Sequence, residues 1–503
     1  AASGRPRRGE ARRRAGPLLA DEVEGGRAAE QEPGRGVADQ PLDPEGHRHC
    51  DQRHEQRDDP DILDDPAARE AYSRDATPLF KGLPEVIVTP HSTSEVAEVV
   101  KFARSTKTQI IARGAGSNLC AATVPLRGGI VVSMMQMKKI LEVSRNEMLA
   151  VVQPGVSTQQ LDEEVSKVGL MYVPDPGSKT VSTIGGNVAT SAGGLRGLKY
   201  GTTKNYILGL EAVLGTGEII RTGGRLVKDV AGYDITRLLI GSEGTLAIFT
   251  EITTVLSPRP QSSQYGVAYF NNLADASVAV DSIVAAGILP ATLEFLDNTC
   301  IKAVEDFANL GLDTNAGALL LFGDDGAQES VAKSVAAMAE ISQSARGVRA
   351  VTLAPDVAAA EALLYARRCS LPALARLGSM SILEDISVPR PQLSKAADAI
   401  EAIGAKHSLL IGTFGHAGDG NLHPTIVINK DDSDEVKRAE KSLSDIFTLA
   451  IDLGGTITGE HGVGSAKLPY LQAKLGDVSL ALHRNIKSVF DPDGVLNPGR
   501  LGS

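Results

Sequence analysis

The segment Gln109-Ile110-Ile111-Ala112-Arg113-Gly114-Ala115-Gly116-Ser117-Asn118 passes from an apolar run into a glycine-rich turn. The apolar run is typical of a β-strand. Glycines directly after a strand let several backbone N–H groups converge on an anion such as a pyrophosphate. An ordinary turn has the same short pattern, so the surrounding sequence has to separate the two interpretations.

The surrounding sequence favours a bound cofactor. A Rossmann fingerprint needs a third glycine where this chain has Leu119, and no P-loop pattern occurs. Glycine nevertheless recurs between residues 174 and 201 together with Ser, Thr and Asn, in Pro174–Ser178, Ser182–Asn187, Ser191–Gly194 and Lys199–Gly201. This repetition suits close approach of the backbone to a large polar cofactor, and the alternative is a loop-rich domain without a ligand.

The composition limits the class of protein. The 503 residues suffice for two or three domains, and a net charge of −11 without a sustained basic patch argues against nucleic acid as a partner. The sequence has no apolar run of about 18 residues, so we expect no transmembrane segment. The four cysteines are scattered singly, which fits a reducing compartment and excludes a CxxC iron–sulfur or zinc-ribbon site. We expect a cytoplasmic protein that contacts the inner membrane face at most peripherally.

Residues 1–57 differ from the rest of the chain. They contain eleven Arg but no Lys, and no Ile, Phe, Tyr, Met, Asn or Thr. With so little apolar surface to offset the entropy of ordering, this segment is predicted to be disordered. Its amino acids are those of G/C-rich codons, so our hypothesis is a mis-translated, out-of-frame extension. Mass spectrometry of the native N-terminus would test it.

The remaining chain divides at a linker. Residues 86–88 read as a strand, residues 95–103 as a helix capped by Ser94, and residues 246–256 as a closing strand. The Pro- and Ser-rich segment 257–263 then reads as a linker. Beyond it, strands alternate with Ala-rich helices, which indicates a mixed α+β second domain. The expected strands there are 266–270, 319–322, 380–387 and 409–414.

A histidine pair marks the second domain. In Gly415–His423, Asp419-Gly420 lies between two apolar runs, which is a strong hairpin signal. With Asp419-Gly420 as a two-residue loop, His416 lies opposite His423, with their Cβ atoms roughly 5 Å apart. Two imidazoles at this distance can share one metal ion.

A third metal ligand is available downstream. Gly459–Gly464 places Glu460 and His461 between glycines that allow tight turns. Two His and one carboxylate leave open coordination positions, as in a reactive rather than a structural metal site. The alternative is that these side chains are hydrogen-bonded loop residues.

From about Asp58 onward the sequence resembles the FAD-linked 2-hydroxy-acid dehydrogenases. This family includes the FAD subunit of glycolate oxidase, cytochrome-type D-lactate dehydrogenases and D-2-hydroxyglutarate dehydrogenase. The motifs occur in the order of the family, at Arg113–Gly116, Ser182–Asn187, Lys228–Asp234, Gly241–Leu246, Gly415–His423, Gly459–Gly464 and Asn497–Gly499.

The resemblance implies an α+β fold with two domains. A lead-in segment, 58–83, would precede a vanillyl-alcohol-oxidase-type (PCMH) FAD-binding domain at 84–260. A C-terminal α+β cap domain with an antiparallel sheet would follow at 261–503 and carry the substrate and metal site. The implied FAD, which we expect to be noncovalent, would be bound by Arg113, Gly114, Ala115, Gly116, Ser117, Asn118, Pro176, Gly177, Thr183, Gly186, Asn187, Gly193, Gly194, Glu243, Ile248 and Asn497.

The resemblance also assigns the chemistry. A divalent metal, Zn or Mn, would be held by His416, His423 and Glu460, and would stabilise an alkoxide that develops on the substrate. His461 would accept the hydroxyl proton while hydride leaves Cα for flavin N5. Arg367 would grip the substrate carboxylate bidentately. Because Arg367 lies in an Ala-rich helical stretch, the alternative is a solvated arginine on a helix face.

Three positions depart from the family pattern. Cys120-Ala121-Ala122 replaces small glycines, so a methyl group could crowd the cofactor. Tyr365 stands where relatives often have Trp. Leu383 stands where relatives that act on 2-hydroxyglutarate have a Lys, which favours a small substrate such as glycolate or D-lactate.

The implied activity is therefore that of an FAD-dependent oxidoreductase of small D-2-hydroxy acids. Its electrons would pass to a quinone, a cytochrome or an iron–sulfur partner subunit, and an oligomer is compatible with the sequence. The alternatives are D-2-hydroxyglutarate dehydrogenase, an alkylglycerone-phosphate-synthase-like transferase without net redox chemistry, and a flavin-binding subunit without an active site.

Overall fold

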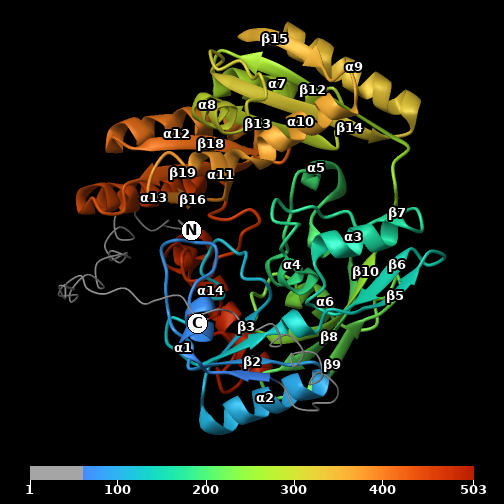
Figure 1. Ribbon diagram of the computed structural model, residues 1–503, viewed down its shortest axis with the longest axis vertical. Helices are drawn as coiled ribbons and strands as arrows, with labels where there is room; N and C mark the ends of the chain where they lie inside the picture. Colours follow the sequence, from blue (N-terminus) through green and yellow to red (C-terminus); the bar gives the residue numbers. More distant parts are fainter. Residues whose placement is uncertain (1–60, 503) are drawn as a thin grey trace, which may run out of the picture.

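The computed structural model describes residues 61–502 (Figure 1). The predicted disorder and mis-translation of residues 1–57 lie outside the described residues. Figure 1 shows two bodies stacked along the long axis, the lower one formed mainly by the first half of the chain and the upper one by the second half. None of the helices between residues 61 and 502 is long and apolar enough to cross a membrane.

A small, mostly parallel sheet begins the lower body. Its strand order is β1 (Asp61–Leu63), β2 (Val86–Thr89), β4 (Ile130–Ser133) and β3 (Ile110–Arg113). Helix α2 (Thr93–Thr106) covers it with a buried apolar face. The predicted cap, Ser94, was wrong by two residues because the Ser92 side chain accepts the Glu95 N–H.

A five-stranded antiparallel sheet completes the lower body. Its order is β5 (Ile140–Ser144), β6 (Leu149–Val152), β10 (Ala247–Val255), β8 (Ile207–Leu214) and β9 (Ile219–Gly223). Helices α3 (Thr158–Ser166) and α4 (Ile184–Thr190) pack against the apolar cluster of this sheet. Val213 and Ile248 join the core of the parallel sheet, so the two sheets share one apolar cluster.

The expected linker at 257–263 is mostly in strands. β11 (Ser257–Pro258) pairs with β7 (Leu170–Met171), and β12 begins at Ser262. Only residues 259–261 separate the two strands, because the backbone around them is used for sheet pairing.

The upper body is built on an eight-stranded antiparallel sheet. Seven strands follow the order β15 (Val348–Leu353), β12 (Ser262–Phe270), β14 (Ala318–Gly326), β13 (Thr292–Asp297), β18 (Leu410–His416), β19 (Asn421–Ile428) and β16 (Met380–Leu383), and β17 (Ile386–Ser387) also pairs with β19. One apolar cluster packs α7 (Leu273–Ala285), α9 (Gln328–Ser344), α12 (Leu393–His407) and α13 (Ser433–Asp452) on the sheet. A second cluster packs α8 (Asn298–Ala308), α10 (Val357–Arg368) and α11 (Ser370–Leu374).

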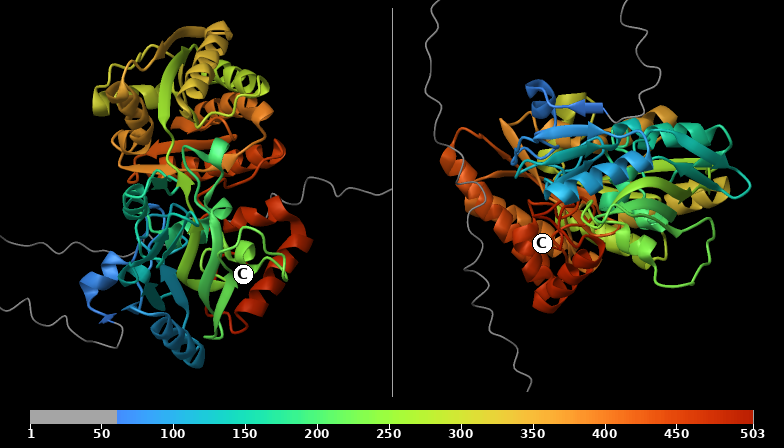
Figure 2. Two further views of the ribbon diagram at one scale, coloured as in Figure 1. Left: turned by 90° about the vertical axis from the view of Figure 1, so that its right-hand side faces the viewer. Right: turned by 90° about the horizontal axis from the view of Figure 1, so that it is seen from below.

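The end of the chain returns to the lower body. Helix α14 (Leu471–Phe490) packs Ile486 and Phe490 against the five-stranded sheet and lies beside the lower body in Figure 2. The following segment lines the free edge of β3, where the Ile110 N–H donates to Val495 O and the Asn497 N–H donates to Ile110 O. The final residues therefore belong spatially to the first half of the chain.

Candidate active site

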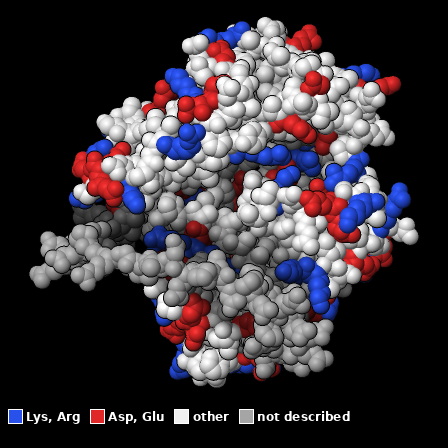
Figure 3. Space-filling view, viewed as in Figure 1, with Lys and Arg blue, Asp and Glu red and all other residues white. Residues whose placement is uncertain are grey.

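A cavity of about 550 Å³ lies between the two bodies. The glycine-rich loops of the lower body line one part of it, and α10, β16, β18 and β19 of the upper body line the other. Figure 3 shows this face hollowed between the two bodies, with Lys and Arg side chains along the upper rim of the hollow. The cavity thus joins the two halves of the chain in one site.

Most of the residues predicted to bind the cofactor line this cavity. They are Arg113, Gly114, Ala115, Gly116, Ser117, Asn118, Pro176, Gly177, Thr183, Gly186, Asn187, Glu243 and Ile248. The backbone N–H groups of Ala115, Gly116 and Ser117 donate to no other residue within 61–502, so they are free for a ligand. An anion-binding turn in the lining of this cavity fits the implied FAD.

Three predicted cofactor residues lie behind the lining. A Cβ at Gly193 would lie 2.5 Å from Glu460 Oε2, and Gly194 packs against the backbone of Asp175. The Asn497 amide donates to Ala122 O at 3.0 Å and to Glu243 O at 2.7 Å. Because their contacts are made with other protein atoms, these three residues support the wall of the cavity and do not line it.

The alanines that replace glycines crowd the cavity less than expected. Ala122 lines the cavity, whereas Ala121 is fully buried with φ +59° and does not line it. The Cys120 thiol donates to the His461 carbonyl at 3.2 Å. Only one of the two methyl groups therefore faces the space for the cofactor.

The histidine hairpin forms with a register that differs from the prediction. Its loop has four residues, and the pairing is His416 with Asn421 and Phe414 with His423. His416 O accepts the N–H groups of Asp419 and Gly420, which closes this wider loop. The register differs by an even number of residues, so both imidazoles still face one side, with ring centroids 5.2 Å apart.

The structure brings together the three predicted metal ligands, His416, His423 and Glu460. Glu460 Oε1 lies 3.0 Å from His416 Nε2 and 3.5 Å from His423 Nε2, and one ligand atom from each residue lies within 4.8 Å of the others. Burial would lower the pKa of His416, but the carboxylates of Glu294 and Glu460 raise it well above its usual value. This buried negative potential fits a divalent cation held by the three side chains.

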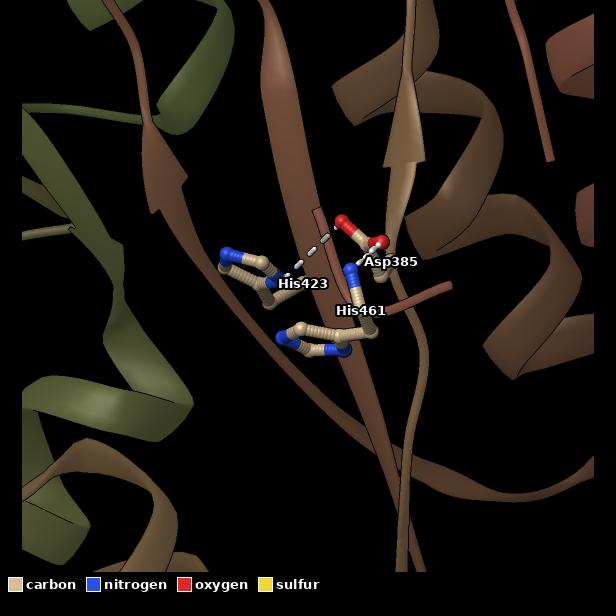
Figure 4. A group of neighbouring side chains, drawn as sticks. All are labelled: Asp385, His423 and His461. Carbon is tan, nitrogen blue, oxygen red and sulfur yellow. Dashed lines mark hydrogen bonds and ion pairs between the residues drawn. The ribbon is translucent and has the colours of Figure 1, made fainter. Parts of the chain in front are cut away.

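Asp385, His423 and His461 form a second group (Figure 4). Asp385 Oδ2 accepts the N–H groups of Gly459, Glu460 and His461 and the Thr458 hydroxyl, and its Oδ1 accepts the Asn421 amide. Because these donors occupy its lone pairs, Asp385 anchors the loop and is a poor metal ligand. Sequence reasoning missed it, because the predicted strand 380–387 included Glu384-Asp385, whereas the structure interrupts this strand between β16 and β17 at these two carboxylates.

His461 lines the cavity as a neutral imidazole. Burial lowers its pKa to about 4, against the opposing effect of Asp385. Its ring stacks on His423 at a centroid distance of 5.0 Å, and its buried Nδ1 has no hydrogen-bond partner within the described chain. A neutral imidazole with an unused nitrogen can accept a proton.

Arg367 is buried, so its interpretation as a solvated helix residue is wrong. Its Nε donates to Glu294 Oε2 at 2.7 Å, and its guanidinium lies over the Phe414 ring at 4.7 Å. Its two terminal nitrogens donate to no other residue of 61–502, and the side chain lines the cavity. Leu383 lines the same cavity, whereas Tyr365 is half exposed and does not.

Glu243 ties the lower body to the loop that carries His461. Its carboxylate accepts the N–H groups of Val463 at 2.6 Å and Gly464 at 2.7 Å. Burial raises the pKa of this carboxyl, while the two N–H donors oppose the rise. Both carboxylate oxygens of Glu243 therefore bind protein N–H groups, and the residue contributes to the cavity as part of its wall.

Fold and site define a flavoprotein oxidoreductase, and the comparisons agree. Residues 84–223 match the family described as FAD binding domain, and residues 259–501 match FAD linked oxidases, C-terminal domain. The glycolate oxidase subunit GlcD of Bacillus subtilis (strain 168) is 46% identical over 88% of this chain and 94% of its own. A D-lactate dehydrogenase of Anaerostipes hadrus is 34% identical over 86% of this chain and 92% of its own.

A solved structure of p-cresol methylhydroxylase with substrate bound shares the fold. Its TM-score is 0.75 at 18% identity, with 88% of this chain and 93% of the other covered. The predicted α+β fold with a PCMH-type FAD-binding domain is confirmed. The chain belongs to the FAD-linked oxidases, and it is an FAD-linked hydroxy-acid oxidoreductase.

Proposed function

We propose that this protein oxidises a small D-2-hydroxy acid, glycolate or D-lactate, to the 2-oxo acid. The observation that carries the proposal is the meeting of three groups in one cavity. They are the terminal nitrogens of Arg367, the neutral imidazole of His461, and the His416, His423 and Glu460 cluster. The names of the glycolate oxidase and D-lactate dehydrogenase relatives support the same substrate class.

Each side chain has a distinct task in this reaction. Arg367 binds the substrate carboxylate through its terminal nitrogens, since its Nε is already held by Glu294. His461 accepts the hydroxyl proton as hydride leaves Cα. When bound, FAD supplies the hydride acceptor, and a Zn or Mn ion held by His416, His423 and Glu460 supplies charge stabilisation at the substrate oxygen.

The cavity wall favours a short substrate. Leu383 and Phe414 both line it, and the Phe414 ring lies against the guanidinium of Arg367. Neither side chain offers a positive charge to a second carboxylate, so a dicarboxylate such as D-2-hydroxyglutarate would lack a partner on this wall. A methyl group or a hydrogen atom at Cα suits these apolar side chains.

The proposal also includes the route of the electrons. The chain carries no CxxC iron–sulfur motif, so electrons pass to a quinone, a cytochrome or an iron–sulfur partner subunit. The name of the Bacillus subtilis relative, a glycolate oxidase subunit, supports a multisubunit arrangement. FAD is bound noncovalently, and the proposed location is the cytoplasm, with at most peripheral contact with the inner membrane face.

Anaerobic visible spectroscopy tests this function. The purified FAD-loaded protein is mixed separately with glycolate, D-lactate, L-lactate and D-2-hydroxyglutarate, and flavin bleaching is followed. Bleaching by glycolate or D-lactate is expected. Bleaching by D-2-hydroxyglutarate alone would overturn the substrate size, and bleaching by none would overturn the reaction.

A further inference from the structure

Glu294 on β13 contacts two functional side chains at once. Its Oε1 accepts the Nδ1–H of His416 at 2.7 Å, and its Oε2 accepts the Nε–H of Arg367 at 2.7 Å. The residue is 1% exposed, so water does not compete for either bond. Strand β13 places it there by pairing with β18, where Phe295 lies opposite Gly415.

The first bond orients the imidazole of His416. With Nδ1 held as a donor, Nε2 is the nitrogen that faces Glu460, at 3.0 Å. A carboxylate on the far nitrogen of a ligating histidine fixes both the ring and its tautomer, and makes the near nitrogen a better ligand. Glu294 therefore presents the nitrogen that a cation requires.

The second bond orients the guanidinium of Arg367. Glu294 takes only the Nε–H, and the Phe414 ring supports the guanidinium plane at 4.7 Å. The two terminal nitrogens donate to no other residue of 61–502, and the Arg367 side chain lines the cavity. A guanidinium fork held in this way is ready for a bidentate carboxylate.

We propose that Glu294 is a positioning residue that sets His416 and Arg367 jointly, so that one buried carboxylate controls both metal ligation and carboxylate binding. The part of this inference that concerns the substrate rests on the proposed function. The part that concerns the metal rests on the two hydrogen bonds and can be measured without substrate.

The Glu294→Gln variant separates these roles. A glutamine has one acceptor oxygen, and its amide N–H groups would face the N–H of either Arg367 or His416. His416 can avoid this conflict only with Nδ1 unprotonated, which puts the proton on Nε2 and blocks the cation. The matched control is Asp297→Asn on the same strand, a partly buried carboxylate that accepts the N–H groups of Cys300 and Thr413 and does not contact the cluster.

The readout is calorimetric titration of Zn²⁺ or Mn²⁺ into FAD-loaded protein from which metal has been stripped. We expect Glu294→Gln to weaken metal binding by about 10- to 100-fold, the usual cost of losing such a partner, while Asp297→Asn stays within about 3-fold of the wild type. The flavin content should stay unchanged, and the KM for the 2-hydroxy acid should rise. Wild-type metal affinity and wild-type KM in Glu294→Gln would overturn the proposal.

A second variant covers a failure of Glu294→Gln to fold. Glu294→Asp keeps the charge and both acceptors but withdraws them by one methylene, so it should bind the metal several-fold more weakly than the wild type. Wild-type affinity and KM in Glu294→Asp would also overturn the proposal. If the wild type oxidises none of the acids while metal affinity still depends on Glu294, the proposed function fails and the metal role of Glu294 stands.

Discussion

The buried carboxylate of Asp385 accepts the backbone N–H of His461 at 2.9 Å. The same oxygen accepts the N–H groups of Gly459 and Glu460, so one side chain shapes the whole turn that carries the proposed base and a proposed metal ligand. Asp385 is fully buried, and burial alone would raise its pKa, but the nearby His461, Lys467 and His423 hold it well below the usual value.

Asp385→Asn should therefore damage the site more than the fold. An amide N–H placed among backbone donors repels them, so we expect the turn to open and flavin reduction by substrate to fall at least about 100-fold. The cost in unfolding free energy should be about 1–3 kcal/mol in urea titrations. The neighbouring Glu384→Gln is the matched control, and equal turnover in the two variants would contradict the anchoring role.

His461→Ala should remove the proposed base and leave the flavin in place. Flavin reduction by substrate should drop by about 100-fold or more, the usual contribution of a general base. Stopped-flow absorbance measures the reduction, and the flavin spectrum of the resting protein reports retention. His483→Ala on α14 is the control, since its ring bonds Ser479 O and does not line the cavity. Unchanged reduction in His461→Ala would refute the assignment.

Leu383→Lys should change the preferred substrate. A cation at this position of the cavity wall can pair with a second carboxylate, so the KM for D-2-hydroxyglutarate should fall by about 10-fold or more. The efficiency with D-lactate should fall because an ammonium group then faces its methyl group. Leu383→Met keeps the volume without the charge and should leave both substrates as in the wild type. Steady-state kinetics with the two acids decides the matter.

Salt should slow the enzyme at limiting substrate. Arg196 and Arg368 both approach Asp175, at 3.9 and 3.8 Å, and Lys179 interacts with the same carboxylate, so cations outnumber anions there. Arg368 lines the cavity, so this excess attracts an anionic substrate.

We expect kcat/KM to fall several-fold between about 20 and 200 mM salt, with kcat nearly constant. Arg368→Gln should flatten this dependence. The control is Arg346→Gln, which should not, because Arg346 pairs with Asp275 and does not line the cavity. A salt-independent kcat/KM in the wild type would contradict this steering.

Asp297 should make stability depend on pH. Burial raises its pKa to about 6, above the usual 3.8, so its neutral form is favoured in the folded state. Its stabilising contribution is complete below about pH 4 and is lost as the pH rises through about 6. Asp297→Asn lacks this loss. The stability of the variant relative to the wild type should therefore rise by about 2 kcal/mol between pH 4.5 and 7.5.

The measurement is urea unfolding of both proteins at the two pH values. Asp297→Asn also removes the acceptor of the Thr413 N–H, which lowers the free energy of unfolding. This cost is the same at both pH values, so it cancels when they are compared. A pH-independent difference between the two proteins would contradict the raised pKa.

Local patterns predicted the glycine-rich turns and the cluster of His416, His423 and Glu460. Their chemistry depends on a few adjacent residues, and an even error in hairpin register keeps both imidazoles on one face. The sequence analysis did not identify Glu294 and Asp385, because these two residues bond to partners more than 70 positions away in the chain. A helical pattern likewise cannot tell whether the Arg367 face is solvated, since the burial of that face is decided by β13 and β18.

The return of residues 495–497 to the edge of β3 bears on how the protein is made. A ribosome completes β3 long before it reaches these residues, so the emerging first half waits with an open sheet edge until the end of the chain arrives. The two halves should therefore mature together rather than one after the other. A chaperone that shields this edge during translation would improve the yield of flavin-loaded protein.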